Sequence, residues 1–210
     1  MSRSIAVLDY GSGNLHSVAH ALAASGVDVS LVKSKAEADA AGAMGLVVPG
    51  VGAFAACMEG LRAIGGDEFV RSWVASGRAL LGVCVGHQIL FSSGTEHGVA
   101  TNGVGVFDGV VERLDAKRLP HMGWNTVDVA QASALFAGVE LERFYFVHSY
   151  AVRSWGDAQG AITWATHEQD RFVAAVERDN VFATQFHPEK SGAAGAKLLA
   201  NWIKVCETQA

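Results

Sequence analysis

Short apolar runs alternate with amphipathic segments through the first half of the chain. The runs have the length of buried strands, and the segments between them carry apolar residues at helical spacing. Strands are predicted at residues 5–8, 27–32, 45–48 and 79–83. Helices are predicted at residues 15–24, 35–41, 53–64, 67–76 and 87–91. Strands that alternate with helices indicate parallel βαβ units.

The pattern changes after Phe91. Residues 92–105 are rich in glycine and polar side chains, so we expect a loop there. Strands are then predicted at residues 104–111, 126–129, 144–147, 160–166, 172–176 and 181–185, and a final helix at 193–206. Residues 168–170 suit a hairpin turn between two of these strands. We predict one α/β domain over residues 1–210, with a mostly parallel central sheet, flanking helices and an antiparallel extension.

Cys84 lies between Gly82 and Gly86, where the strand at 79–83 meets a helical segment. Glycines on both sides leave room for a sharp corner, so the pattern predicts a nucleophile elbow with cysteine in place of serine. A thiol at a helix N-terminus faces unpaired N–H groups, which favour its thiolate. The alternative is a buried cysteine that packs as a small hydrophobic residue.

His187 and Glu189 supply the base and the orienting acceptor that a cysteine nucleophile needs. They lie two residues apart after the last predicted strand, where alternation would put both side chains on one face. Sites in open α/β sheets form beyond the carboxyl ends of parallel strands, where Cys84 and residues 49–52 also lie. The sequence therefore predicts a Cys84–His187–Glu189 triad for acyl transfer. The alternative is a surface histidine beside a surface glutamate.

Composition excludes several other classes of protein. The net charge of −5 argues against a nucleic-acid-binding surface. The three cysteines are widely spaced without a CxxC pair, and no HxH or HExxH spacing occurs, so we expect neither disulfides nor a metal. With no leader-like start and no apolar stretch of membrane-spanning length, we expect a cytoplasmic protein. The turn at residues 11–14 lacks the last glycine of GxGxxG, so no nucleotide cofactor is expected.

Two motifs together resemble the class I, triad-type glutamine amidotransferases: GVCVGHQ at residues 82–88 and HPE at 187–189. Five longer segments resemble the glutaminase subunits of imidazole glycerol phosphate synthases, which act in histidine biosynthesis. They are DYGSGNL (9–15), PGVGAF (49–54), PHMGWN (120–125), FYFVHSY (144–150) and HPEKSG (187–192). The resemblance covers nearly the whole chain and implies the flavodoxin-like fold of these amidotransferases.

The resemblance also implies roles for the predicted catalytic residues. Cys84 would form a glutamyl thioester, His187 would transfer protons and Glu189 would orient His187. Residues 50–52 (Gly50, Val51 and Gly52) would form a switchable oxyanion strand. With the N–H of Val85, this strand would bind the oxyanion of the tetrahedral intermediate.

Substrate and partner contacts are implied in the same way. Gln88 and the backbone of Ser149 and Tyr150 would hold glutamine. Ammonia would pass to a separate cyclase subunit of imidazole glycerol phosphate synthase, which forms imidazole glycerol phosphate and an aminoimidazole-carboxamide ribotide in a heterodimer. The positions that match cyclase-facing ones are Asn14, Trp124, Tyr145 and Lys190.

One departure from the resemblance follows the cysteine. These glutaminases usually have Leu-Gly-Met there, whereas this chain has Val85-Gly86-His87, which is more typical of amidotransferases that serve anthranilate or carbamoyl-phosphate synthesis. We interpret His87 as a buried, hydrogen-bonded core histidine; the alternative is a group that titrates near Cys84. The alternative functions are the glutaminase of another synthase, a stand-alone γ-glutamyl hydrolase or cysteine peptidase, and a flavodoxin-like binding module with an inert Cys84.

Overall fold

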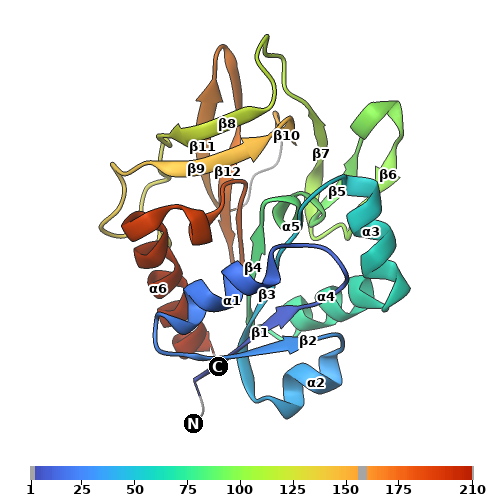
Figure 1. Ribbon diagram of the computed structural model, residues 1–210, viewed down its shortest axis with the longest axis vertical. Coiled ribbons are helices and arrows are strands. Elements are labelled where there is room, and N and C mark those ends of the chain that lie inside the picture. The colour runs from blue at the N-terminus through green and yellow to red at the C-terminus, as the bar shows by residue number, and fades with distance from the viewer. Residues whose placement is uncertain (1–2, 156–159, 210) are drawn as a thin grey trace.

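Seven strands form the central sheet of the computed structural model, which describes residues 3–155 and 160–209 (Figure 1). They are β1 (Ser4–Leu8), β2 (Asp28–Val32), β3 (Ala43–Val48), β4 (Ala79–Val83), β11 (Ala161–His167), β12 (Asp170–Arg178) and β13 (Val181–Thr184). Their order is β11-β12-β13-β4-β3-β1-β2. The strands from β13 to β2 pair in parallel, whereas β11, β12 and β13 pair antiparallel. The predicted parallel core with an antiparallel extension is confirmed.

Burial explains why the parallel strands were visible as continuous apolar runs. Every residue of β1, β3 and β4 is buried, because helices cover both faces of this part of the sheet. In β2, at the sheet edge, Val32 is the one buried residue, and Asp28 and Leu31 are exposed. The apolar runs thus mark the middle of the sheet, and β4, which leads to Cys84, lies among them.

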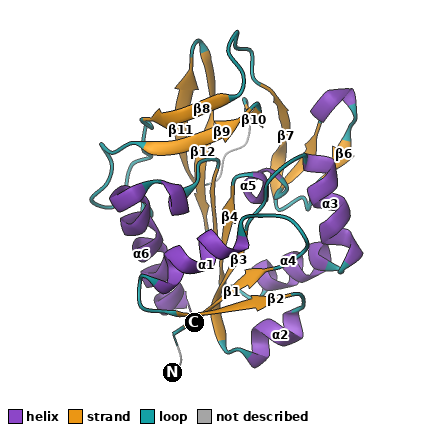
Figure 2. Cartoon of the chain, viewed as in Figure 1, coloured by secondary structure: helices purple, strands orange, loops and turns teal. Residues whose placement is uncertain are grey.

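The helices pack around the central sheet (Figure 2). They are α1 (Leu15–Ala23), α2 (Lys35–Ala40), α3 (Phe54–Ala63), α4 (Gly66–Ala75), α5 (Val85–Gln88) and α6 (Gly192–Gln209), with 3₁₀ turns η1 (Glu96–Gly98) and η2 (Pro188–Lys190). Helix α1 packs against α6, and α3 against α4. Helix α1 begins after Asn14, whose side chain accepts a hydrogen bond from the Ser17 N–H at 3.4 Å, as an N-cap residue should.

The helix predicted at 87–91 and the loop predicted at 92–105 are both wrong. Helix α5 ends at Gln88, and Phe91 opens a strand. This strand belongs to a second sheet of β5 (Phe91–Gly94), β6 (Thr101–Asn102), β7 (Phe107–Arg113) and β10 (Tyr150–Val152). The Phe91 ring packs 5.2 Å from Phe107 and 5.3 Å from Trp155, between centroids. This tertiary packing outweighs the local preference.

The strand predicted at 126–129 is also wrong. The strand is β8 (His121–Asn125), which pairs with β9 (Phe144–His148) in a two-stranded antiparallel sheet. Met122 and Trp124 are more than half exposed on one face of β8, whereas His121 is buried on the other. The sequence did not predict β8, because its buried position His121 is polar and its exposed positions Met122 and Trp124 are apolar, the reverse of the usual strand pattern.

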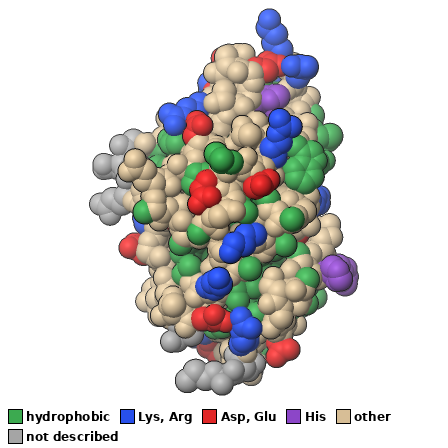
Figure 3. All heavy atoms as spheres, turned by 90° about the vertical axis from the view of Figure 1, so that its left-hand side faces the viewer, with side chains coloured by type: hydrophobic (Ala, Val, Ile, Leu, Met, Phe, Trp, Pro, Cys, Tyr) green, Lys and Arg blue, Asp and Glu red, His purple; other side chains and the backbone are tan. Residues whose placement is uncertain are grey.

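The surface and the helices add two observations. On the face that Figure 3 shows, Lys and Arg side chains are interspersed with acidic and hydrophobic ones, and neither sign forms a continuous stripe. Within residues 3–155 and 160–209, no helix combines the length and the apolar character needed to cross a membrane.

Candidate active site

Cys84 occupies the sharp corner that the sequence predicts. Its backbone angles, φ 56° and ψ −112°, lie outside the regions that L-residues prefer, and such strain persists only where surrounding contacts enforce it. The Cys84 N–H donates to the Thr184 carbonyl at 2.8 Å, and the Cys84 carbonyl accepts from the Gln88 N–H at 3.1 Å. Position 86 must be glycine, because a Cβ there would lie 1.9 Å from the Val48 carbonyl oxygen.

His187 and Glu189 form the predicted pair, by a route that the sequence prediction had wrong. His187 Nδ1 lies 2.8 Å from Glu189 Oε1, and each side chain is only 3% exposed. Strand β13 ends at Thr184, so strand alternation does not align them. They meet because η2 turns the chain directly after His187. The His187 N–H donates to the Tyr145 carbonyl at 2.9 Å, and Ser191 Oγ donates to the His187 carbonyl at 2.7 Å, which fixes this turn.

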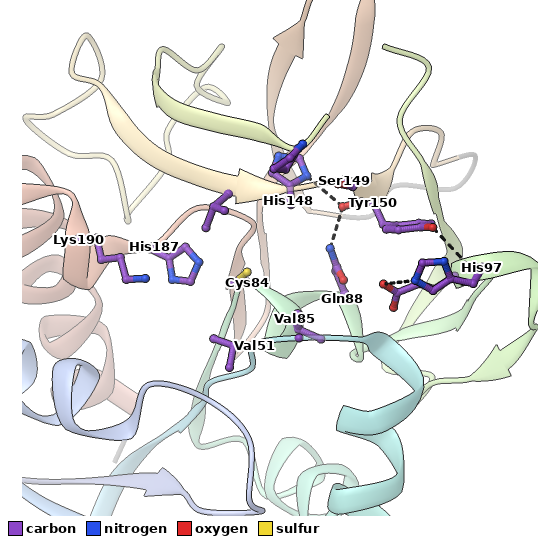
Figure 4. A pocket seen from close by; sticks show the side chains of 14 residues that line it. Val51, Cys84, Val85, Gln88, His97, His148, Ser149, Tyr150, His187 and Lys190 are labelled. Atoms are coloured by element: carbon purple, nitrogen blue, oxygen red, sulfur yellow. Dashed lines mark hydrogen bonds and ion pairs between the residues drawn. The ribbon is translucent and has the colours of Figure 1, made fainter. Parts of the chain in front are cut away.

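The surroundings of His187 favour its protonated form. Burial alone would lower its pKa, but interactions with Cys84 and Glu189 outweigh burial and raise the pKa to about 9. Figure 4 shows the sulfur of Cys84 beside the His187 ring. Within the described residues, the second Glu189 oxygen has no hydrogen-bond partner, so this buried carboxylate depends on His187 for its compensation. The arrangement can hold a thiolate–imidazolium pair.

A cavity of about 460 Å³ opens over Cys84 (Figure 4). Its walls include the predicted glutamine-binding residues Gln88, Ser149 and Tyr150. Gln88 is buried, and its Nε2 donates to the Tyr150 carbonyl at 2.8 Å and to Gln185 Oε1 at 2.9 Å. Its amide N–H groups therefore hold the wall of the cavity together.

Glu96 is a cavity residue that sequence reasoning missed. It lies in η1, and one of its carboxylate oxygens accepts a hydrogen bond from the Phe54 N–H at 2.6 Å. The other oxygen lies 3.9 Å from His97 Nε2. The segment was expected to be loop, and a lone glutamate in a loop carries no sequence signal. Glu96 places a carboxylate in the wall of the cavity that also contains the Cys84 thiol.

The predicted oxyanion residues lie next to Cys84, but the N–H groups of Val85 and Val51 are engaged elsewhere. The Val85 N–H donates to the Gly50 carbonyl at 3.3 Å. The Val51 N–H donates to Ser12 Oγ at 3.3 Å, and the Val51 carbonyl accepts from Ser12 Oγ at 2.9 Å and from Cys57 Sγ at 3.3 Å. A rotation of the Gly50–Val51 peptide would free both donors.

The predicted partner-facing residues lie on a common side of the cavity. Turn η2, which contains Lys190, contacts both α1, which follows Asn14, and β9, which contains Tyr145. The Trp124 ring meets the Tyr145 ring edge-on at 6.1 Å, and Trp124 is 53% exposed. Asn14 and Lys190 are also exposed. These residues form an exposed rim that reaches the cavity at Lys190.

His87 is buried, as predicted, but the predicted hydrogen bonds are absent. Within the described residues, neither ring nitrogen has a hydrogen-bond partner, and the ring meets Phe91 edge-on at 5.1 Å. Burial lowers the pKa of His87 to about 3, so the alternative of a group that titrates beside Cys84 near neutral pH is also wrong.

Among the described residues, the cysteines form no disulfide and no group of side chains is suited to a metal ion. Cys57, Cys84 and Cys206 are all free and buried. In the part of the chain that the structure describes, no three or more His, Cys, Asp or Glu side chains are grouped so that they could hold a metal ion.

Comparisons with known proteins agree on one family. The model of the family described as glutamine amidotransferase class-I matches residues 6–205. The chain is 55% identical to imidazole glycerol phosphate synthase subunit HisH of Corynebacterium diphtheriae, over 96% of this chain and 98% of that protein. It is 57% identical to subunit HisH of Nocardia farcinica, over 96% and 97%. A crystal structure of a glutamine amidotransferase superposes with a TM-score of 0.75 at 22% identity, over 97% and 98%.

We expect His87→Met to stabilise the protein by about 1 kcal/mol, because the unpaired buried ring costs about 1 to 3 kcal/mol and methionine fills a similar volume without polar groups. The pKa of His87 in the folded chain, about 3, lies below its ordinary value of 6.5. Between these two pH values the unfolded chain binds a proton at His87 and the folded chain does not, so His87 destabilises the fold there. The gain should therefore grow as the pH falls below 6.5. Urea unfolding at pH 7.5 and pH 5.5 measures the gain in stability and its dependence on pH.

His16→Met is the matched control, because His16 is exposed on α1. Its effect should stay within about 0.5 kcal/mol at both pH values. A lower urea midpoint for His87→Met than for the wild type would show that the ring is paired after all.

Proposed function

This chain belongs to the class-I glutamine amidotransferase family, and we propose that it is the glutaminase subunit of an imidazole glycerol phosphate synthase. In this role it hydrolyses glutamine and passes the ammonia to a cyclase subunit in a heterodimer. The observation that carries the chemistry is a single one: in the wall of the cavity, the sulfur of Cys84 lies beside the His187 ring, whose Nδ1 is paired with Glu189 (Figure 4).

The proposed reaction is acyl transfer through a thioester. The Cys84 thiolate attacks the side-chain amide carbon of glutamine and forms a tetrahedral oxyanion. The imidazolium of His187 donates its proton to the amide nitrogen, which leaves as ammonia and yields the glutamyl thioester. Neutral His187 then accepts a proton from water, whose oxygen attacks the thioester and releases glutamate. Glu189 keeps the ring oriented and stabilises its positive charge throughout.

Substrate binding follows from the walls of the cavity. Its volume of about 460 Å³ lies in the range of small-molecule sites. The Glu96 carboxylate is suited to the α-ammonium group of glutamine, and the backbone at Ser149 and Tyr150 to its other polar groups. Gln88 supports the Tyr150 backbone from behind.

We assign the control of activity to the segment at residues 49–52. While the Gly50 carbonyl accepts the Val85 N–H and Ser12 Oγ accepts the Val51 N–H, neither of these two donors is free for the oxyanion. A partner that binds the exposed rim of Trp124, Tyr145, Asn14 and Lys190 would favour the rotated peptide by population shift.

The alternatives have less support. A stand-alone γ-glutamyl hydrolase would need its oxyanion donors free without a partner, and here they are engaged. The glutaminase of an anthranilate-type synthase is favoured only by His87. Relatives that share 53–57% identity over nearly the whole chain carry the HisH name instead.

The function is tested by ammonia release from glutamine, measured with and without the cyclase subunit and its bound ligand. We expect little release by the chain alone and strong stimulation by the partner. Cys84→Ala should reduce the stimulated rate to background, and Glu189→Ala should lose roughly 100-fold less, because an orienting group is partly replaceable.

Three outcomes contradict parts of this proposal. Full activity of Cys84→Ala would exclude every cysteine mechanism. Rapid hydrolysis without the partner would favour the stand-alone hydrolase. Equal losses in Cys84→Ala and Glu189→Ala would give Glu189 a larger role than orientation.

The alkaline limb of kcat/KM for glutamine should report the deprotonation of His187. Its pKa of about 9 is raised in part by Glu189, so activity should fall as the pH rises through this value. Glu189→Gln keeps a hydrogen-bond acceptor but removes the charge, and it should move the limb to lower pH. A limb that stays in place would show that Glu189 does not set the protonation of His187.

Ser12→Ala should raise partner-independent glutamine hydrolysis severalfold. The Ser12 hydroxyl binds both the N–H and the carbonyl of Val51, so its loss should make the rotated peptide less unfavourable. The partner-stimulated rate should change little. Ammonia release by the isolated chain measures the effect.

Ser17→Ala, in the same region of the chain, is the control and should leave the basal rate unchanged. If Ser12→Ala has the basal rate of the wild type, this hydroxyl does not hold the resting segment.

A further inference from the structure

A chain of polar side chains outside the catalytic trio leads from β8 to the cavity. His148 Nδ1 lies 3.0 Å from the Tyr150 carbonyl oxygen. His148 Nε2 lies 3.0 Å from His121 Nδ1, and His121 Nε2 lies 3.3 Å from Asn125 Nδ2. Because His121 and His148 are directly opposed in the pairing of β8 with β9, the two rings are in register. We call His148, His121 and Asn125 the histidine chain.

The partners of the histidine chain determine where each proton lies. A carbonyl oxygen can only accept, so His148 must carry its proton on Nδ1 and donate to Tyr150. Nε2 of neutral His148 must then accept from the Nδ1–H of His121. Nε2 of neutral His121 must accept in turn from Asn125. The Asn125 amide is oriented by its own contacts, since Nδ2 also donates to the Thr166 carbonyl at 3.0 Å.

Both rings are held neutral by their surroundings. Burial lowers the pKa of His148 to about 3, and burial together with His167 lowers that of His121 to about 4. Phe172 meets His148 edge-on at 4.7 Å, and Phe146 stacks on His121 at 4.9 Å. A neutral imidazole has one donor and one acceptor, and each of these four ring nitrogens is used.

The histidine chain ends at the Tyr150 carbonyl, which also accepts a hydrogen bond from Gln88. Tyr150 O accepts from Gln88 Nε2 at 2.8 Å and from His148 Nδ1 at 3.0 Å, as the dashed lines in Figure 4 show. Two donors on one carbonyl fix the plane of the Tyr150–Ala151 peptide and limit its rotation. His148, Ser149 and Tyr150 all line the cavity.

We propose that His148 is a positioning residue for glutamine: its Nδ1–H, held in place by His121 and Asn125, orients the Tyr150 carbonyl and with it the backbone at residues 149–150. The inference rests on the proposed function, because it concerns the same cavity. It assigns the histidine chain a role in substrate binding and leaves the bond-breaking steps to Cys84 and His187.

Two substitutions of His148 separate positioning from structural support. The amide nitrogen of asparagine falls near Nδ1 of histidine and can donate to Tyr150, whereas the amide oxygen of glutamine can reach the position of Nε2 and accept from His121. His148→Asn therefore keeps a donor toward Tyr150 and loses the contact with His121, whereas His148→Gln does the reverse. Both variants remove the ring, so they share any cost to packing.

In the complex with the cyclase subunit, His148→Gln should raise the KM for glutamine about tenfold, the factor that a lost buried hydrogen bond would produce. Its kcat should stay within about twofold of the wild type. The KM of His148→Asn should lie close to that of the wild type. Equal KM values in the two variants, or a loss confined to kcat, would overturn the positioning role.

Nitrogen-15 NMR of the histidine side chains tests the arrangement without glutamine. His148 should carry its proton on Nδ1 and stay neutral from pH 6 to pH 8, and a proton on Nε2 would overturn the inference. Failure of the wild-type complex to hydrolyse glutamine would overturn the proposed function, and the positioning role with it. Activity in the wild type with unchanged KM in both variants would overturn the positioning role alone.

Discussion

The close approach of Gly86 to the end of β3 is the constraint on which the active site depends. With no side chain at position 86, the first turn of α5 lies directly on the Val48 carbonyl, where any Cβ would collide. This contact puts Cys84 beside the segment at residues 49–52 and forces the Cys84 backbone into a region that costs about 1 to 3 kcal/mol. Two hydrogen bonds offset that strain: the Cys84 N–H donates to Thr184 of β13, and the Cys84 carbonyl accepts from Gln88 of α5. Nucleophile and oxyanion segment are therefore adjacent because two backbones touch.

Charge compensation is the second constraint. Burial disfavours the charged form of His187, but Cys84 and the Glu189 carboxylate, which lies 2.8 Å from its Nδ1, outweigh that cost. The same cavity wall contains His148, which has no carboxylate and is neutral. Two buried histidines thus differ in protonation because of their neighbours, and only the charged one can act as a proton donor to a leaving group.

Much of the parallel core could be predicted from the sequence, because strands buried on both faces are continuous apolar runs. The elbow at Cys84 and the pairing of His187 with Glu189 were also predictable, since flanking glycines and a base–acceptor pair are local signals. The small sheets were not: β5 exists because Phe91 packs on Phe107 and Trp155, which are distant in sequence. Three features of the site could not be predicted from the local sequence, because each depends on residues that are neighbours only in the folded chain. They are the place of Glu96 in the cavity wall, the unpaired ring of His87 among the described residues, and the engaged N–H groups of the oxyanion segment.

The side chains to which we assign the chemistry are assembled, whereas the backbone that would stabilise the oxyanion is not. Two neutral hydrogen bonds hold the Gly50–Val51 peptide in its present orientation: the Val85 N–H donates to its carbonyl, and its N–H donates to Ser12 Oγ. Each contributes about 0.5 to 1.5 kcal/mol, so the resting orientation is favoured by roughly 1 to 3 kcal/mol, which corresponds to a factor of about 5 to 150. Contacts with a partner readily supply a differential binding energy of that size. A gate built from backbone rotation can therefore keep glutamine hydrolysis low without disturbing the protonation of His187 or the position of the thiol.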